Sequence, residues 1–437
     1  MTVCTQTSFE FPVANRRRVQ ASFTGGDVSS DGGVLLVRQA DRRLKLTATL
    51  ARRLPELRCP GKVEHALGTL LRQRIYGLCQ GYEDLNDHDR LRSDVALQTA
   101  VEQDRDLASA STLCRWETGV DRQAAWIVHE LLLEQFIASH REPPSELVLD
   151  LDATDDPVHG QQEGAFFHGY YAQYCFLPLY VFCGERLLVA YLRPSNIDVA
   201  RHAWAIVALL VKRLRQAWPQ VHLVVRADSG FCRWRLLRWC DRHQVGYIMG
   251  VAKNERLLAL AQPWMEQAAS GYAATQQKQR VFAEVEYAAH TWDRARRVIV
   301  KAEHTEKGRN PRFVVTNLDG EPQALYDQLY CARGEMENRI KEQQLGLFAD
   351  RTSCHGWWAN QWRLLLSGLA YTLMEALRRI GLAGTELARA QCGTIRLKLL
   401  KIGAVLVRNT RRVRFLLAAS CPYQELFATA VARLASG

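Results

Sequence analysis

The sequence predicts an α/β protein whose core is a mixed β-sheet. Two runs, ELVLDLDAT and VHLVVRAD, are rich in branched apolar residues, as is typical of buried strands. Between and after them, apolar residues recur at spacings of three and four, which indicates amphipathic helices. Upstream, Pro143 and Pro144 end a region whose pattern is helical. This change of pattern marks the start of the predicted sheet.

The order of the predicted elements narrows the fold class. Three strands come first, and Gly184 between the second and the third predicts a tight hairpin. Helices and strands then alternate. In order, the elements are strands 146–154, 174–182 and 186–192, helix 198–216, strand 221–228, helix 232–244 and strand 245–251. This succession is the RNase H-like order, and it predicts a mixed sheet with helices on both faces.

Three consecutive segments are expected from these patterns. Residues 1–145 form a mostly helical region, residues 146–380 form the sheet domain, and residues 381–437 form a basic C-terminal region. In the first segment, SASTLCRWE predicts a short helix capped by Ser109 or Ser111. That helix fits either a DNA-reading role or an ordinary place in a helical bundle.

The sheet domain contains an expected insertion. The stretches VFAEVEYAAHTW, RRVIVKAEHT and RFVVTNL have β character, so a β-rich insertion is predicted at about 256–325. Two helices should follow it, at 331–347 and at 359–380, the second ended by Gly381.

The charge of the chain favours an anionic partner. The formal net charge is +11, and residues 381–437 contain nine Lys or Arg but only two acidic residues. Such a surface attracts phosphate backbones, although a solvated basic tail is the alternative. We expect a cytoplasmic protein, because the chain has no run of about 18 apolar residues and no secretory pattern at its start.

Two acidic residues lie in the first predicted strand. Asp150 and Asp152 are two residues apart, so their side chains share one face of the strand. Carboxylates within an apolar strand are costly unless they meet cations or hydrogen-bond donors. Asp228 ends the strand VHLVVRAD, and the carboxyl ends of strands are where open α/β sheets bind ligands. These positions indicate a polar site at the sheet; solvated strand ends are the alternative.

The helix predicted at 331–347 carries a polar face. At 100° per residue, one face contains Tyr330, Arg333, Glu337, Lys341 and Gln344. An exposed helix with Glu–Lys pairs is the alternative explanation, but the tyrosine and the arginine contribute nothing to such pairs. The face therefore predicts a surface that holds metal and phosphate.

Carboxylates on separate elements suit one chemistry in particular. Mg²⁺ prefers oxygen ligands and keeps several waters, so a few Asp or Glu residues are enough to hold it. Two such ions can activate an attacking hydroxyl and stabilise a leaving oxygen in phosphodiester chemistry. Asp152, Asp228 and Glu337 are the candidates for two Mg²⁺ ions, with Mn²⁺ as a substitute.

Three blocks of sequence carry a resemblance to a known family. They are LDLDATDDPVHGQQEGAFFHGYY, RADSGF followed by YIMGVAKN, and YCARGEMENRIKEQQLGLFADRTSCHGWWANQWR. On these blocks the chain resembles the DDE transposases of bacterial insertion sequences, in transposase DDE domain group 1. The branch it resembles has a Tyr-x-x-Arg-x-x-x-Glu signature and a β-strand insertion.

This resemblance implies an RNase H-like fold of the retroviral-integrase kind and a metal-binding triad of Asp152, Asp228 and Glu337. Asp152 is preferred to Asp150 because the family's aspartate shortly precedes a threonine, here Thr154. The implied activity is metal-dependent cutting at the ends of an insertion sequence, followed by joining to target DNA. The implied partners are double-stranded DNA, as terminal inverted repeats and as target, and a second copy of the chain.

The resemblance also implies that Tyr330 and Arg333 contact DNA phosphates. The family's signature continues to a lysine seven residues after the glutamate, where this chain has Gln344, and Lys341 is the nearest lysine on the same face. Residues 1–145 are then expected to bind DNA ends or to dimerise. The further expected DNA contacts are Lys253, Asn254, Arg396, Lys398, Lys401, Arg411 and Arg412.

Stacking on splayed bases is one interpretation of five tryptophans, but places in the core are favoured for them. They are Trp234, Trp239, Trp357, Trp358 and Trp362.

Overall fold

The computed structural model describes residues 8–435, which divide into two compact units. Within this range, unit 1 comprises residues 8–119, 346–348 and 369–435, and unit 2 comprises residues 120–345 and 349–368. The chain thus returns to unit 1 after building unit 2. No helix within residues 8–435 combines the length and the apolar content needed to cross a membrane.

Unit 2 is built on a sheet in which eight strands lie in the order β12-β13-β15-β11-β10-β4-β8-β9, with the short β14 pairing with β13. Strand β10 is parallel to both β11 and β4, whereas β8 is antiparallel to both β4 and β9. The strands are β4 (Glu146–Ala153), β8 (Leu179–Cys183), β9 (Arg186–Tyr191), β10 (His222–Ala227), β11 (Gly246–Val251), β12 (Gln279–Tyr287), β13 (Arg296–Thr305), β14 (Gly308–Arg309) and β15 (Arg312–Thr316).

Five of these strands reproduce the predicted RNase H-like arrangement. Numbered by their order of appearance, β11-β10-β4-β8-β9 read 5-4-1-2-3, with the second strand antiparallel to the first. Glu185 and the left-handed Gly184 (φ 57°) form the predicted hairpin turn between β8 and β9. The fold class predicted from the sequence is therefore confirmed.

Helices cover both faces of this sheet, as predicted. On one face, apolar residues of four helices pack in a single core against the strands. On the other, Tyr326 packs over Val224, Ile248 and Val314. The four helices are α7 (Arg122–Ala138), α8 (Ala203–Ala217), α9 (Trp234–Arg242) and α10 (Glu255–Thr275).

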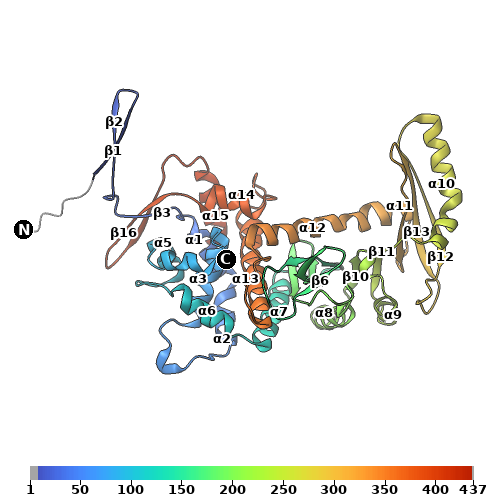
Figure 1. Ribbon diagram of the computed structural model, residues 1–437, viewed down its shortest axis with the longest axis horizontal. Coiled ribbons are helices and arrows are strands. Elements are labelled where there is room, and N and C mark those ends of the chain that lie inside the picture. Colours follow the sequence, from blue (N-terminus) through green and yellow to red (C-terminus); the bar gives the residue numbers. More distant parts are fainter. Residues whose placement is uncertain (1–7, 436–437) are drawn as a thin grey trace, which may run out of the picture. The chain divides into compact units, whose positions relative to one another are not determined.

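The predicted insertion differs from the structure at its start. Residues 255–275 form the helix α10, which lies along β12 and β13 in Figure 1, at the start of an insertion that was predicted to be rich in β structure. Pro263 and Gly271 lie inside this helix and obscure its apolar pattern. The three predicted strands are present, and β15 pairs directly with β11, so the insertion extends the central sheet.

A second difference lies at residues 174–182, which were expected to form one strand. Pro178, which has no N–H to donate, separates β7 (Gln173–Phe176) from β8. Strand β7 instead joins a small separate sheet of order β5-β7-β6, with β5 (Asp156–Pro157) and β6 (Phe166–His168).

The helix predicted at 331–347 is segmented. Regular α-helix covers only α12 (Gly334–Lys341), between the tighter turn η5 (Cys331–Arg333) and the wider, π-helical turn η6 (Glu342–Gly346). A further π-helical turn, η4 (Leu325–Tyr330), follows α11 (Pro322–Ala324) and precedes η5.

The helix predicted at 359–380 is present as α13 (Trp357–Ala376), continued by η7 (Leu377–Gly381). Trp357 and Trp358, near the end of the third sequence block, are its first two residues.

Unit 1 combines the N-terminal helices with the C-terminal residues. Strand β16 pairs with both β17 and β3 in a three-stranded sheet, and α1 packs against α15. Its strands and longer helices are β1 (Ser8–Ala14), β2 (Arg17–Ser22), β3 (Asp27–Ser29), α1 (Val34–Leu44), α2 (Leu46–Arg53), α3 (Leu67–Gln80), α5 (Val95–Val101), α6 (Ala110–Thr118), β16 (Ala404–Arg408), β17 (Val413–Leu417) and α15 (Gln424–Ala435). Its short turns are η1 (Pro60–Lys62), η2 (Leu85–Asp87), α4 (His88–Leu91), α14 (Cys392–Ile395) and η8 (Arg396–Leu400).

The helix predicted at SASTLCRWE is α6. Ser109 caps it by accepting a hydrogen bond from the backbone N–H of Thr112. Leu113 and Trp116 are buried, which fits an ordinary bundle helix.

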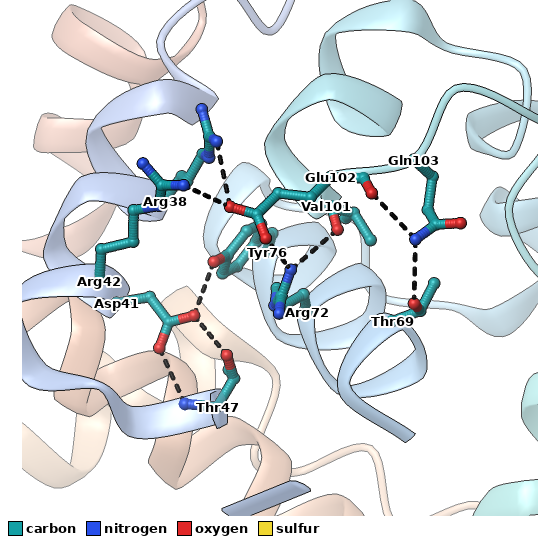
Figure 2. A network of polar contacts seen from close by, with 10 residues as sticks. All are labelled: Arg38, Asp41, Arg42, Thr47, Thr69, Arg72, Tyr76, Val101, Glu102 and Gln103. Carbon is teal, nitrogen blue, oxygen red and sulfur yellow. Dashed lines mark hydrogen bonds and ion pairs between the residues drawn. The ribbon is translucent and has the colours of Figure 1, made fainter. Parts of the chain in front are cut away.

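A polar network fastens the helices of unit 1 to one another. Figure 2 shows Glu102, just after α5, between Arg38 and Arg42 of α1 and Arg72 of α3, at N–O distances of 3.0, 2.7 and 2.8 Å. Beside it, the buried Asp41 accepts a hydrogen bond of 2.7 Å from the Tyr76 hydroxyl. Each carboxylate therefore has its donors within the protein.

Candidate metal and DNA site

The site begins with an ion pair inside the sheet. Asp150 of β4 and Arg226 of β10 are direct partners in the parallel register. The guanidinium of Arg226 donates two hydrogen bonds to the Asp150 carboxylate, of 2.5 and 2.7 Å, and a third to the carbonyl of Leu329. Both side chains are buried, so Asp150 is committed to holding two strands and η4 together.

Asp152 lies two residues farther along the same face and meets a different arginine. Its Oδ2 is 3.2 Å from Nη1 of Arg333, and the other terminal nitrogen of Arg333 is paired with Glu337. One guanidinium thus lies between a carboxylate from β4 and a carboxylate from α12. Asp152 and Glu337, which are far apart in sequence, are brought to the same place.

Asp228 follows β10 directly, next to the strand that carries Asp152. Its Oδ1 accepts a hydrogen bond of 2.9 Å from the N–H of Gly230, which caps the turn η3 (Ser229–Phe231). The charges of Asp228 and Glu337 both raise the pKa of Asp152. The three carboxylates are therefore within electrostatic range of one another.

Tyr330 completes the cluster on the helix side. A Cβ placed on Gly250 of β11 would lie 2.7 Å from the Tyr330 hydroxyl and 3.0 Å from the backbone nitrogen of Ser229. Only a glycine leaves room for the tyrosine there. Gly250 is thus a residue of this site that was not predicted from the sequence, because it has no side chain that could indicate a role.

The electrostatics of the cluster show a shortage of positive charge. Burial raises the pKa of Asp152 to about 6, against the opposing effect of Arg333. Burial opposes the charge of Arg333, but the pKa of Arg333 is raised, because Asp152, Glu337, Tyr330 and Asp228 all favour the cation. Two carboxylates share one guanidinium and a third adds negative charge nearby, so the site would be stabilised by additional positive charge.

The donor set fits a hard divalent cation. Asp152, Asp228 and Glu337 offer carboxylate oxygens, which Mg²⁺ prefers, and Arg333 shows that a cationic group is stabilised between two of them. Within residues 8–435, no three His, Cys, Asp or Glu side chains converge closely enough to form a metal site. Closer approach of the carboxylates would require Arg333 to move from between Asp152 and Glu337.

Comparison with known proteins identifies the family. Residues 11–436 match the family described as transposase DDE domain group 1. The chain belongs to this transposase family. No curated protein sequence matches the chain.

One solved structure that aligns with this transposase is a cryo-EM structure of a piggyBac transposase synaptic complex with hairpin DNA. The TM-score is 0.43 at 9% sequence identity, over 84% of this chain and 79% of that one. The fold assignment rests on the strand order of the sheet itself.

The two candidates for the signature lysine have different surroundings. In this transposase, Gln344 donates a hydrogen bond of 3.0 Å to the carbonyl of Asp155, just beyond β4. Lys341 is exposed at the end of α12. Gln344 thus has a structural contact, and Lys341 is the one available to a solvent-borne anion.

The pair Lys253 and Asn254 also divides. Asn254 caps α10 by accepting a hydrogen bond of 3.1 Å from the N–H of Leu257, and its amide donates to the Tyr287 hydroxyl. Lys253 is exposed immediately before this cap.

Three basic residues near the C-terminus contact other groups of unit 1. Arg396 donates to the carbonyls of Leu78, Cys79 and Gly346 and is partly buried. Lys401 pairs with Asp31 at 2.7 Å, and Lys398 lies 3.5 Å from Glu386.

Arg411 and Arg412 occupy a different position. They lie in the turn between β16 and β17, where the side chain of Asn409 accepts hydrogen bonds from both of their backbone N–H groups. Their side chains are exposed. Of the five basic C-terminal candidates, these two are the ones on an exposed turn.

Of the five tryptophans, one lies in the core, as favoured, and the other four are partly buried. Trp362 is buried, Trp357 packs edge-on against Phe176 at 5.6 Å, and Trp239 stacks on His243 at 4.3 Å. Trp234 lies beneath Arg235 and is partly buried, as is Trp358. None of the five is exposed.

Proposed function

We propose that this chain cuts DNA at the ends of an insertion sequence and joins the freed ends to target DNA, with Asp152, Asp228 and Glu337 as its catalytic carboxylates. One observation carries the proposal. Carboxylates from β4 and α12 flank a single arginine, and a third, at the end of β10, lies within electrostatic range of them in a chain of the transposase DDE family. A cluster so rich in negative charge at a basic protein's sheet favours a metal-binding role over a structural one.

Mg²⁺ is the proposed cofactor, with Mn²⁺ as a substitute, and the three carboxylates would hold two ions. When bound, the metal lowers the pKa of the attacking hydroxyl and stabilises the leaving oxygen. The protein's share is positioning. The Arg226–Asp150 pair fixes the relative position of β4, β10 and η4, so Asp152 and Asp228 are presented on neighbouring strands.

Tyr330 and Arg333 are proposed to bind the phosphate at the cut. Both lie beside the carboxylates, and an arginine offers two parallel donors that match phosphate oxygens. Lys341, Lys253, Arg411 and Arg412 are proposed as further contacts to the DNA backbone, because their side chains are exposed. The DNA partners are the terminal repeats and the target, and a homodimer on paired ends is proposed.

Cleavage of a labelled duplex tests the proposal. The duplex contains the inverted repeat that flanks the gene, and the native chain, Asp228→Asn and the control Glu335→Gln are compared with Mg²⁺. Glu335 is an exposed acid on the same helix as Glu337. We expect cutting at the repeat boundary by the native and control proteins, and a loss on the order of 10³-fold in Asp228→Asn, since the metal loses a charged ligand.

Added target DNA then separates the alternatives. Joined products support a transposase, and cutting without joining supports an RNase H-like nuclease without strand transfer. Binding without cutting, unchanged by Asp228→Asn, would mean that the chain is a DNA-binding relative that does not cut.

A further inference from the structure

Unit 1 has two apolar surfaces that nothing in the chain covers. The first belongs to the hairpin of β1 and β2, residues 8–22, here called the N-terminal arm. Its two strands form a sheet of their own, and every residue in them is exposed. A two-stranded hairpin without support is only marginally stable in water. The N-terminal arm is therefore expected to pack on another surface.

The two faces of the N-terminal arm differ in polarity. Phe9 is paired with Ala21 across the strands, and Phe11 is paired with Val19 on the same face. Phe23 extends this apolar face, because its ring lies 5.9 Å from that of Phe9. Such alternation is typical of a sheet with one face packed on a core, yet Phe9 and Phe11 are 44% and 54% exposed. The opposite face carries Ser8, Glu10, Gln20 and Ser22.

The second uncovered surface is one face of the sheet β17-β16-β3. Val405 of β16 is paired with Leu416 of β17 and with Val28 of β3, so three apolar side chains form a row across the sheet. Leu416 and Val28 are 51% and 61% exposed. On the opposite face, Ala404 and Leu406 are buried. This sheet thus has a core on one side and an exposed apolar row on the other, which marks an interaction surface.

A short connection joins the two surfaces. Only residues 23–26 separate β2 from β3, and Gly26 in this connection is left-handed, with φ 73°. Glycine adopts this conformation readily, so the connection allows the arm to leave the sheet at an angle. Although the two apolar faces are so close in sequence, both remain exposed in the single chain. Another molecule is therefore needed to cover them.

The chemistry of the two faces favours a protein over DNA as that molecule. Phosphate contacts require positive charge, but the arm's apolar face carries only phenylalanine, valine and alanine at its paired positions and at Phe23. The arginines Arg16, Arg17 and Arg18 lie at and next to the turn of the arm. On the sheet, Arg414 borders the apolar row and does not interrupt it. Two apolar sheet faces instead suit each other, because they can stack and exclude water.

We propose that the N-terminal arm of one chain packs its apolar face on the exposed row of the β17-β16-β3 sheet in a second copy, and that the two copies exchange arms. A two-fold exchange covers both surfaces of both chains with one repeated contact. The inference deepens the proposed homodimer and rests on that part of the proposed function. It requires neither metal nor cleavage.

Sedimentation of the full chain over a concentration series, without DNA or metal, tests the inference. The arm variant is Phe9→Ser with Phe11→Ser, and the sheet variant is Val405→Ser with Leu416→Ser. All four side chains are at least partly exposed, so the fold of unit 1 should persist. We expect a dimer of the native chain and a rise of roughly 100-fold in the dissociation constant of each variant, since two apolar side chains are lost from every contact.

A mixture of the arm variant and the sheet variant makes the test specific for exchange. A heterodimer of the two keeps one intact contact, between the unaltered arm and the unaltered sheet, whereas either homodimer keeps none. We therefore expect dimers in the mixture at concentrations where each variant alone is monomeric. Pairing of arm with arm would instead leave the sheet variant dimeric by itself, which would refute the exchange.

Two controls are matched to the variants. Glu10→Ser with Gln20→Ser alters the polar face of the same arm. Leu57→Ser removes an exposed leucine elsewhere in unit 1. Both should leave the dissociation constant unchanged, and the thermal melting curve of each variant confirms that it is folded.

Three results would overturn the inference: a monomeric native chain, unchanged dimerisation in either variant, or a mixture no more dimeric than its components. A monomeric chain whose melting temperature falls in both variants would place the arm on its own sheet. Weaker DNA binding with unchanged dimerisation would assign the arm to DNA. A dimer that survives both variants refutes the exchange and retains the proposed homodimer. Failure to cut the repeat duplex, with sedimentation as expected, refutes the proposed cleavage and retains the exchange.

Discussion

The two units each contain a cluster of arginines and carboxylates, but with opposite charge balance. In unit 1, three arginines share Glu102 (Figure 2). Burial alone would raise the pKa of Glu102, yet Arg38, Arg72 and Arg42 together lower it below the usual value. This cluster is complete without any partner from outside the protein.

In unit 2, two carboxylates share one arginine and a third lies nearby. Arg333 reaches Asp152 and Glu337, and Asp228 adds to the negative charge. The pKa of Asp152 is raised to about 6, whereas that of Glu102 is lowered. Proximity of acids and arginines therefore does not by itself indicate function. The balance of charge does, because a cluster that lacks positive charge is suited to bind a cation.

The largest expected effect is a difference between substitutions of Asp152 and Asp150. Asp152→Asn should reduce cleavage on the order of 10³-fold and should not lower the melting temperature, since it removes like-charge repulsion. Asp150→Asn should lower the free energy of unfolding by about 3 kcal/mol, because Arg226 would be left buried without its partner. Cleavage assays and urea denaturation of both variants check this. Equal stability losses would mean that both acids are structural.

The pH dependence of stability extends the comparison to Asp156. Burial raises the pKa of this carboxyl to about 8, against the opposing effect of a hydrogen bond of 2.8 Å from the Thr352 hydroxyl. Because the folded pKa lies above the unfolded one, its contribution is present below pH 4 and is lost as pH rises through 8. Each pH unit within this window removes up to about 1.4 kcal/mol.

Asp156→Asn should therefore flatten the decline in stability between pH 5 and pH 8. Urea denaturation of the native and variant chains at pH 5 and pH 8 measures the difference in unfolding free energy between the two pH values. Parallel declines in the two proteins would show that another group is responsible.

Removing the charge of Glu102 from the unit 1 cluster should have a smaller effect. Glu102→Gln leaves three arginines without their carboxylate, and we expect a loss of about 1 kcal/mol, since Glu102 is partly exposed and water screens the pairs. Glu306→Gln, an exposed acid in unit 2, is the control. Unchanged cleavage activity is expected in both. Loss of activity in Glu102→Gln alone would show that the unit 1 network takes part in the reaction.

The smallest expected effect is thermal. Magnesium at twice its dissociation constant should stabilise the native chain by roughly 0.6 kcal/mol, or about 1 to 2 °C in melting temperature. Asp228→Asn should show a smaller rise, because it lacks one ligand. Calorimetry with and without MgCl₂ measures the difference. An equal rise in both proteins would place the ion elsewhere.

Much of the fold could be predicted because buried strands leave a local signal. The runs around Asp152 and Asp228 gave both the strand order and the location of the acids at the sheet. The two predictions of secondary structure that were wrong both involve prolines. Pro263 lies inside α10, where tertiary packing of Leu257, Ala261 and Met265 outweighs its cost, and Pro178 divides a run that looked continuous.

The candidate site was predictable only in part. Strand periodicity placed Asp150 and Asp152 on one face, but it could not tell them apart. Their difference comes from Arg226, which stands opposite Asp150 only once β4 and β10 are paired in register. A signal did exist: Arg226 precedes Asp228 by the same two residues that separate Asp150 from Asp152.

The pairing of β15 with β11 has a practical consequence for making shorter forms of this protein. Four residue pairs, from Ile248–Thr316 to Val251–Phe313, cover the edge of β11 that would otherwise be open. Excising the insertion to obtain a minimal domain would leave this row of backbone groups unpaired and ready to add a strand from another molecule. Aggregation should therefore limit such truncations before any loss of chemistry can be measured.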